Sequence, residues 1–78
     1  MIEERIRSVF DQVFHCDAAQ LGKDASPDTV SGWDSFGHME LVDALENAFQ
    51  VTFATEDIAQ METLGRIEQI LLRRGARP

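Results

Sequence analysis

The sequence predicts an all-α fold, a four-helix bundle of three longer helices and one short helix, with a long loop between the first two helices. Three segments carry apolar residues at helical spacing, and residues that favour helix N-termini stand before the later helices. No segment shows the strong apolar–polar alternation of a half-buried strand. We expect residues 1–78 to form a single domain, because a chain this short builds one thin core with little room for a deep catalytic pocket.

The first and second helices each carry one apolar stripe. The first helix is predicted over residues 2–15, and its inner face consists of Ile2, Ile6, Val9, Phe10, Val13 and Phe14. The second helix is predicted to open at Asp34 or Ser35, since either side chain can accept a free backbone N–H there. His38 lies at the top of its inner stripe, which continues with Leu41, Val42, Leu45, Ala48 and Phe49.

Residues 17–33 form a long connection between these helices, and their glycines, proline and surrounding polar residues predict turns. A loop of this length in a small domain is usually functional or held in place by its own apolar residues. We expect Leu21, Val30 and Trp33 to hold this one.

The short helix is expected to end near Met61. Thr55 is its expected N-cap, and the acidic Glu56 and Asp57 suit a first turn, where the helix dipole favours negative charge.

The last helix is expected to be capped by Thr63 and stopped by Gly75. Arg73 and Arg74 suit its last turn, where the dipole favours positive charge. Its inner residues are expected to be Leu64, Ile67, Ile70 and Leu71.

The net charge of −7 disfavours nucleic acid and anionic membranes as partners, because both attract basic surfaces. The charge is also unevenly placed. Residues 34–62 contain seven acidic residues and no Lys or Arg, whereas residues 63–78 contain four Arg and one Glu. A field of one sign can steer basic partners, although a solvated face that aids solubility explains the same charges.

Cys16 is the single cysteine, so no internal disulfide is possible. His15, Cys16 and His38 lack metal-ligand spacing, and we expect no metal site. No apolar run is long enough for a signal peptide or a membrane span, and we therefore expect a cytoplasmic protein. Met1 and the short tail after Gly75 favour a free-standing protein over a domain cut from a larger synthase.

The second helix has an unusual outward face. Phe36 and Met39 lie off the inner stripe, and Glu40, Asp43 and Glu46 continue the outward strip as acidic residues. Apolar residues bordered by carboxylates suggest a docking surface. The alternative is that Phe36 and Met39 pack under the long loop.

Ser35 is the candidate reactive residue of this region. A catalytic triad with Asp34 and His38 is disfavoured, since all three residues sit within about one helical turn and the histidine must bridge the other two. The helix N-terminus suits a phosphate ester instead, because its free N–H groups and positive dipole end favour negative charge. A plain N-cap serine explains the hydroxyl but not its surroundings.

The segment WDSFGHMELVDALENAFQV resembles the signature of acyl carrier proteins, in which Asp-Ser-Leu opens the second helix and a Glu-Leu pair follows. The short acidic helix and the Thr63-Leu64 start of the last helix match the family as well. The resemblance covers nearly the whole chain, and it implies an acyl-carrier-like arrangement of the bundle.

The resemblance implies that Ser35 carries 4'-phosphopantetheine, whose thiol holds acyl groups as thioesters, and that the protein is a carrier and not an enzyme. Asp34 would present the serine to a phosphopantetheinyl transferase. Further partners would be an acyl-loading ligase or acyltransferase, a ketosynthase or other acyl-processing enzymes with basic docking surfaces, which a monomeric carrier would visit in turn. The partner-facing residues would be Phe36, Met39, Glu40, Asp43, Glu46, Glu56 and Asp57.

Three positions depart from the family pattern. Phe36 replaces the usual Leu, Gly37 stands where many fatty-acid carriers have an acidic residue, and Asp43 replaces a frequent apolar contact. These departures leave open whether the pathway makes fatty acids, polyketides or a related product. They also leave the alternatives of an aminoacyl, peptidyl or D-alanyl carrier, and of an unmodified interaction domain.

Two further expectations concern packing. We expect His38 to pack against Trp33, and Cys16 to be a packing residue at the end of the first helix. If acyl chains are sequestered, they should enter a space lined by Leu41, Val42, Leu45, Phe49, Phe53, Ile58 and Met61, which are also the residues of an ordinary core.

Overall fold

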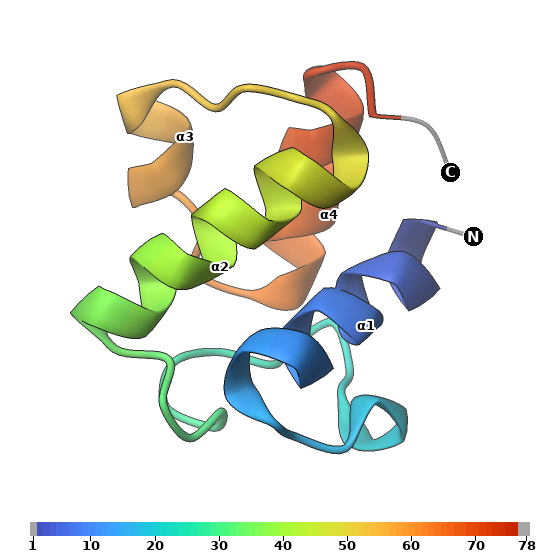
Figure 1. Cartoon of the computed structure of the whole chain (residues 1–78), viewed down its shortest axis with the longest axis vertical. Helices are drawn as coiled ribbons and strands as arrows, with labels where there is room; N and C mark the ends of the chain where they lie inside the picture. The colour runs from blue at the N-terminus through green and yellow to red at the C-terminus, as the bar shows by residue number, and fades with distance from the viewer. Residues whose placement is uncertain (1, 77–78) are drawn as a thin grey trace.

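The computed structural model describes residues 2–76, and no strand occurs among them. In chain order the helices are α1 (Ile2–Phe14), the short 3-10 turn η1 (Ala18–Gln20), α2 (Ser35–Phe49), α3 (Thr55–Ala59) and α4 (Leu64–Arg73) (Figure 1). The predicted all-α fold with three longer helices and one short helix is therefore confirmed. Arg77, counted above with the basic end of the chain, lies outside the described residues.

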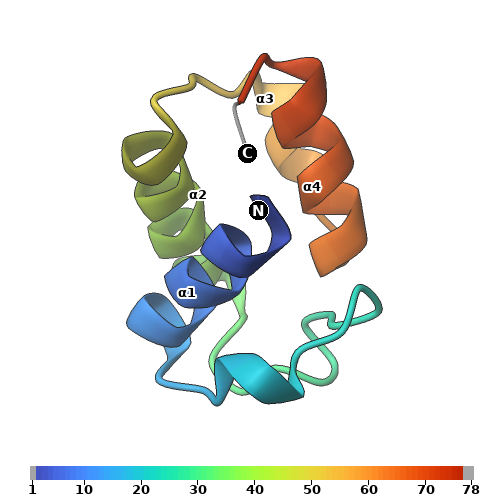
Figure 2. The same ribbon diagram turned by 90° about the vertical axis from the view of Figure 1, so that its right-hand side faces the viewer.

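The three long helices build the core. In Figure 2, α2 and α4 stand on opposite sides of the molecule, and α1 lies between them in the lower half. Side chains fill the space between the ribbons, and Phe10, Leu45 and Leu71 from the three helices are fully buried there. Every predicted inner residue of α4 is buried, as are Leu41, Val42, Leu45 and Phe49 of α2. The stripes therefore face inward as predicted, although three of their members, Val13, Phe14 and Ala48, are only partly buried against the core.

The long loop is held by aromatic packing and by backbone bonds. The Trp33 ring meets Phe10 edge to face at 5.1 Å between centroids and stacks on Phe14 at 6.2 Å. Val30 is buried as well, and Leu21 packs against the core while partly exposed. The predicted anchors of the loop are thus confirmed, and Trp33 fixes the backbone immediately before α2.

The loop also supplies the start of α4. The Leu64 N–H donates to the Ala25 carbonyl at 2.9 Å, and the Gly65 N–H donates to the Lys23 carbonyl at 2.9 Å. These bonds satisfy N–H groups that have no partner inside a helix. Sequence reasoning missed them because they join segments about 40 residues apart, which no local pattern reveals.

One helix cap was predicted wrongly, and one short turn was missed. Ala54, and not Thr55, is the N-cap residue of α3, because the Asp57 carboxylate reaches back to accept the Ala54 N–H at 2.9 Å. The short turn η1 was not predicted, and it follows from Asp17, whose carboxylate accepts the Ala19 N–H. The remaining caps are confirmed: Thr63 caps α4, and Gly75 follows its end with φ +87°.

Gly37 lets the loop backbone pass against the first turn of α2. A Cβ at this position would lie 2.0 Å from the Gly32 carbonyl oxygen and 2.9 Å from the Phe14 ring. No side chain fits there without moving the loop. This contact gives a physical reason for a glycine where many fatty-acid carriers have an acidic residue.

We predict that Gly37→Ala destabilises the protein by about 2 kcal/mol through overpacking. The expected change in the free energy of unfolding is opposite in sign to that of most Gly→Ala substitutions in helices, since alanine normally stabilises an open helical position by about 1 kcal/mol relative to glycine. Urea unfolding followed by Trp33 fluorescence measures the change. Ser8→Ala, at an exposed position of α1, is the matched control and should be neutral or slightly stabilising. A Gly37→Ala variant as stable as the wild type would contradict the close contact.

Candidate functional site

Asp34 and Ser35 form the start of α2, as the sequence predicted. Asp34 has extended backbone angles, and its Oδ1 accepts the Gly37 N–H at 2.9 Å, which makes it the N-cap. Ser35 is the first helical residue and is exposed. Its hydroxyl makes no hydrogen bond within residues 2–76. The site therefore presents a free hydroxyl at the positive end of a long helix.

His38 bridges three parts of the chain. The Trp33 indole Nε1–H donates to His38 Nδ1 at 2.8 Å, and the two rings stack with centroids 6.1 Å apart. Because Nδ1 accepts this hydrogen bond, Nε2 carries the ring proton and donates to the Ile58 carbonyl of α3 at 2.9 Å. Packing against Trp33 is confirmed, whereas the bond to α3 was not predicted.

The same bonds argue against a catalytic triad. Both nitrogens of His38 are occupied by Trp33 and Ile58, and the Asp34 carboxylate caps the helix. No side-chain hydrogen bond joins Ser35 to His38 or His38 to Asp34 in the described chain, where the His38 backbone N–H donates to the Asp34 carbonyl as part of the helix. A serine nucleophile needs a base bonded to its hydroxyl, and within residues 2–76 no base is bonded to this serine.

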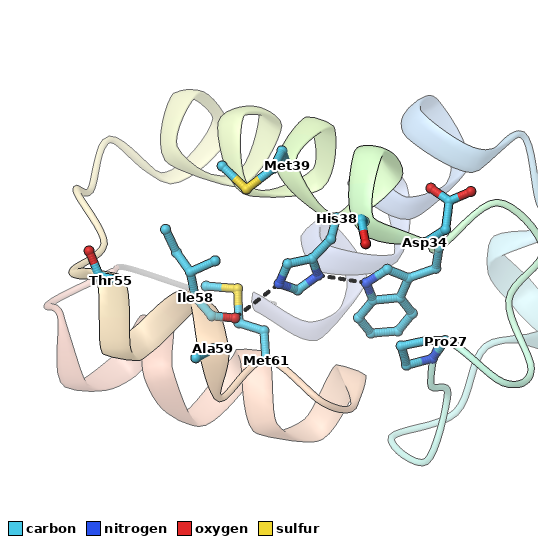
Figure 3. A pocket seen from close by; sticks show the side chains of 10 residues that line it. Pro27, Asp34, His38, Met39, Thr55, Ile58, Ala59 and Met61 are labelled. Atoms are coloured by element: carbon cyan, nitrogen blue, oxygen red, sulfur yellow. Dashed lines mark hydrogen bonds between the residues drawn. The ribbon is translucent and has the colours of Figure 1, made fainter.

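An open cleft of about 660 Å³ lies beside Ser35, between α2 and α3 (Figure 3). Its walls come from the loop, from the first turns of α2 and from α3. The lining is mostly apolar and consists of Pro27, Trp33, Asp34, Ser35, His38, Met39, Thr55, Ile58, Ala59 and Met61. Of the residues expected around a sequestered acyl chain, only Ile58 and Met61 line this cleft.

The other five residues expected around an acyl chain are buried core residues: Leu41, Val42, Leu45, Phe49 and Phe53. The cleft is thus a feature of the surface and is separate from the space that these core residues fill.

The outward face of α2 is exposed. Phe36 is 75% exposed and Met39 is 55% exposed, so the loop does not cover them. Glu40 and Asp43 of the same helix are exposed too. Glu46 is only partly exposed, and its carboxylate accepts the Phe53 N–H at 2.9 Å. Two apolar and two freely exposed acidic side chains therefore follow Ser35 along one helix.

The predicted place of Asp57 on the partner-facing surface is wrong. Its side chain is buried, with the residue 1% exposed, and the carboxylate accepts bonds from Arg74 at 2.7 Å and Arg73 at 3.2 Å. The hydrogen bond from Arg74, with that from the Ala54 N–H, lowers the pKa of Asp57 to about 2. The carboxylate ties α3 to the end of α4, while its neighbour Glu56 is exposed.

Cys16 is partly buried and packs against the core. Burial raises the pKa of its thiol above the ordinary value. The thiol therefore stays protonated at neutral pH and is a poor nucleophile. This agrees with the packing role predicted for it.

The part of the chain that the structure describes contains no group of three His, Cys, Asp or Glu side chains placed to hold a metal ion. None of its helices is both long enough and apolar enough to cross a membrane.

Comparisons with known proteins give a consistent result. A family model described as "phosphopantetheine attachment site" matches residues 4–71. Nineteen chains of solved structures match. One is the solution NMR structure of a holo acyl carrier protein from Geobacter metallireducens, with a TM-score of 0.82 and 25% identity, covering 92% of this chain and 83% of that chain. No curated protein matches the sequence.

We predict that Asp57 makes stability depend on pH in acid. The pKa of Asp57 is lower in the folded state than the ordinary value of 3.8. Its stabilising effect is therefore complete above about pH 4 and is lost as the pH falls towards 2. The melting temperature of Asp57→Asn should lie clearly below that of the wild type at pH 6, and the difference should shrink towards pH 2.

Glu56→Gln is the matched control, because it removes the neighbouring but exposed carboxylate. Its melting temperature should follow the wild type across the same pH range. If both substitutions lowered the melting temperature equally at pH 6, the buried ion pair of Asp57 would be contradicted.

Proposed function

Because the chain belongs to the phosphopantetheine attachment family of acyl carrier proteins, we propose that Ser35 is the residue that carries its 4'-phosphopantetheine. Members of this family are non-catalytic carriers, and the protein is accordingly a carrier and not an enzyme. The observation that supports the assignment to Ser35 is its exposed hydroxyl at the start of α2, which makes no hydrogen bond to any other described residue.

The surroundings of Ser35 fit a phosphodiester. Asp34 caps only the Gly37 N–H, and the first N–H groups of a helix have no intrahelical partners. Their dipoles and the positive end of α2 stabilise a negative charge beside the hydroxyl. Asp34 is exposed and adjacent, so it is the residue we assign to presenting the serine to a phosphopantetheinyl transferase.

When attached, the group supplies a thiol that holds an acyl group as a thioester. The chain's own cysteine is not suited to that task, because the Cys16 thiol is partly buried and has a raised pKa. The cleft beside Ser35 offers apolar lining to whatever Ser35 carries. We propose acyl intermediates of a fatty-acid, polyketide or related pathway as the cargo.

The exposed face of α2 is the proposed docking surface for partner enzymes. It consists of Phe36 and Met39 as apolar contacts and of Glu40 and Asp43 as free carboxylates, with Glu56 of α3 as a further exposed acid. Opposite charges on a partner speed its approach, and small apolar contacts keep the complex short-lived. A carrier that visits a loading ligase or acyltransferase, a ketosynthase and other enzymes in turn needs both properties.

We predict that incubation with coenzyme A, Mg²⁺ and a broad-specificity phosphopantetheinyl transferase adds one phosphopantetheine to the wild type and none to Ser35→Ala. Intact-protein mass spectrometry measures the addition. Ser31→Ala is the matched control, since Ser31 is an exposed loop serine four residues away. It should be modified like the wild type. Modification of Ser35→Ala, or a wild type that is never modified, would contradict the proposal.

We predict that Glu40→Lys or Asp43→Lys weakens productive docking to a basic partner, with a roughly tenfold rise in apparent KM at low salt, because each reverses a charge on the docking surface. The transferase reaction under steady-state conditions gives the value. Asp11→Lys makes the same charge change at an exposed position of α1 and should have little effect.

The difference between the α2 variants and the wild type should fall as salt is raised, since salt screens exposed charges. An unchanged KM for both α2 variants at low salt would place the docking surface elsewhere.

A further inference from the structure

The bridge made by His38 bears on the kind of cargo, and this inference rests on the proposed attachment at Ser35. We propose that His38 closes the passage between α2 and α3, so that an acyl group carried on Ser35 stays in the open cleft and does not enter the helical core. The gate is defined as the His38 side chain with its bonds to Trp33 Nε1 and to the Ile58 carbonyl.

The gate lies where a chain leaving Ser35 would have to pass. His38 follows Ser35 by three residues, so both face the cleft from the first turns of α2. From there the imidazole reaches the Ile58 carbonyl of α3, and Figure 3 draws both of its hydrogen bonds. The ring thus spans the space between the two helices that form the cleft.

The core behind the gate is filled. Leu41 and Leu45 of α2 are completely buried, and Met61 is almost so. A chain that entered would have to push these residues apart and break both bonds of His38. Breaking them would leave the buried Trp33 indole N–H without a partner among the described residues, which is unfavourable away from water. The Ile58 carbonyl would lose its bond from His38 and keep the one from the Met61 N–H at 3.3 Å.

The short helix α3 cannot readily swing away to make room. Its Asp57 carboxylate is bound to Arg73 and Arg74 at the end of α4. Its Ile58 carbonyl is bound to His38 on α2. The helix α3 has only five residues and is bound to both α2 and α4. These bonds keep α3 from moving away from α2, so the passage between the two helices stays closed.

This arrangement favours short or polar acyl groups. The cleft is open to water and mixes the apolar Met39, Ile58 and Met61 with the polar Thr55 and His38. The few carbons of a short acyl group can be shielded from water by contact with these cleft residues. A long saturated chain would leave most of its apolar surface in water, because the gate keeps it from being buried in the core.

The test compares acetyl and octanoyl cargo on one carrier. The wild type is loaded by a broad-specificity transferase from acetyl- or octanoyl-coenzyme A. Intact mass then follows cleavage of each thioester by hydroxylamine. Free acetyl- and octanoyl-pantetheine give the ratio of rates for the unprotected thioesters. The wild type should reproduce that ratio within about twofold, because an acyl group that stays outside the core is not protected.

His38→Ala removes the gate. Its octanoyl thioester should be cleaved at least about fivefold more slowly than that of the wild type, because the chain can then populate a buried state. His38→Gln keeps a side chain that can both accept and donate a hydrogen bond and should restore the wild-type rate. His15→Asn, at the other and exposed histidine, should behave like the wild type.

The outcomes separate the two proposals. A wild-type octanoyl thioester protected about tenfold or more beyond the free compound would overturn the gate while leaving Ser35 as the attachment site, since burial of the chain is then established. A folded His38→Ala with no added protection would overturn it too. If circular dichroism shows that His38→Ala does not fold, the wild-type ratio still decides. Failure of any group to attach contradicts the proposed function and the gate with it.

Discussion

The packing of Trp33 into the aromatic cluster of α1 is the contact on which the rest of the site depends. Its ring is buried against Phe10 and Phe14, and its indole N–H is bound to His38. These contacts fix the loop immediately before α2, so that Asp34 can cap the helix and Ser35 begins it. Gly37 completes the arrangement by letting the loop backbone approach the first turn. The exposed hydroxyl is thus placed by buried apolar packing.

The acidic residues of α2 and α3 divide into two groups with different tasks. Asp57 and Glu46 are used internally, the first by Arg73 and Arg74 and the second by the Phe53 N–H. Glu40, Asp43 and Glu56 stay exposed. The surface field that a partner meets is therefore weaker than the sequence count suggests, and it is concentrated along α2.

Local physical chemistry accounts for what the sequence could predict. The apolar stripes, the caps Asp34 and Thr63 and the outward Phe36 all depend on residues within a turn or two. The features that the sequence could not predict depend on how the helices pack against one another. Glu56 and Asp57 are adjacent acids in one short helix, and only the orientation of α3 against α4 decides which one is buried. The reach of His38 to Ile58 is equally invisible to a local pattern.

The central claim is that Ser35 bears the prosthetic group, and peptide mapping of the modified protein tests it most directly. Tandem mass spectrometry of proteolytic fragments that span the loop and α2 can distinguish Ser26, Ser31 and Ser35, the three serines of that region. The account predicts the phosphopantetheine on Ser35 alone. A phosphopantetheine found on Ser26, on Ser31 or on any other residue would contradict it.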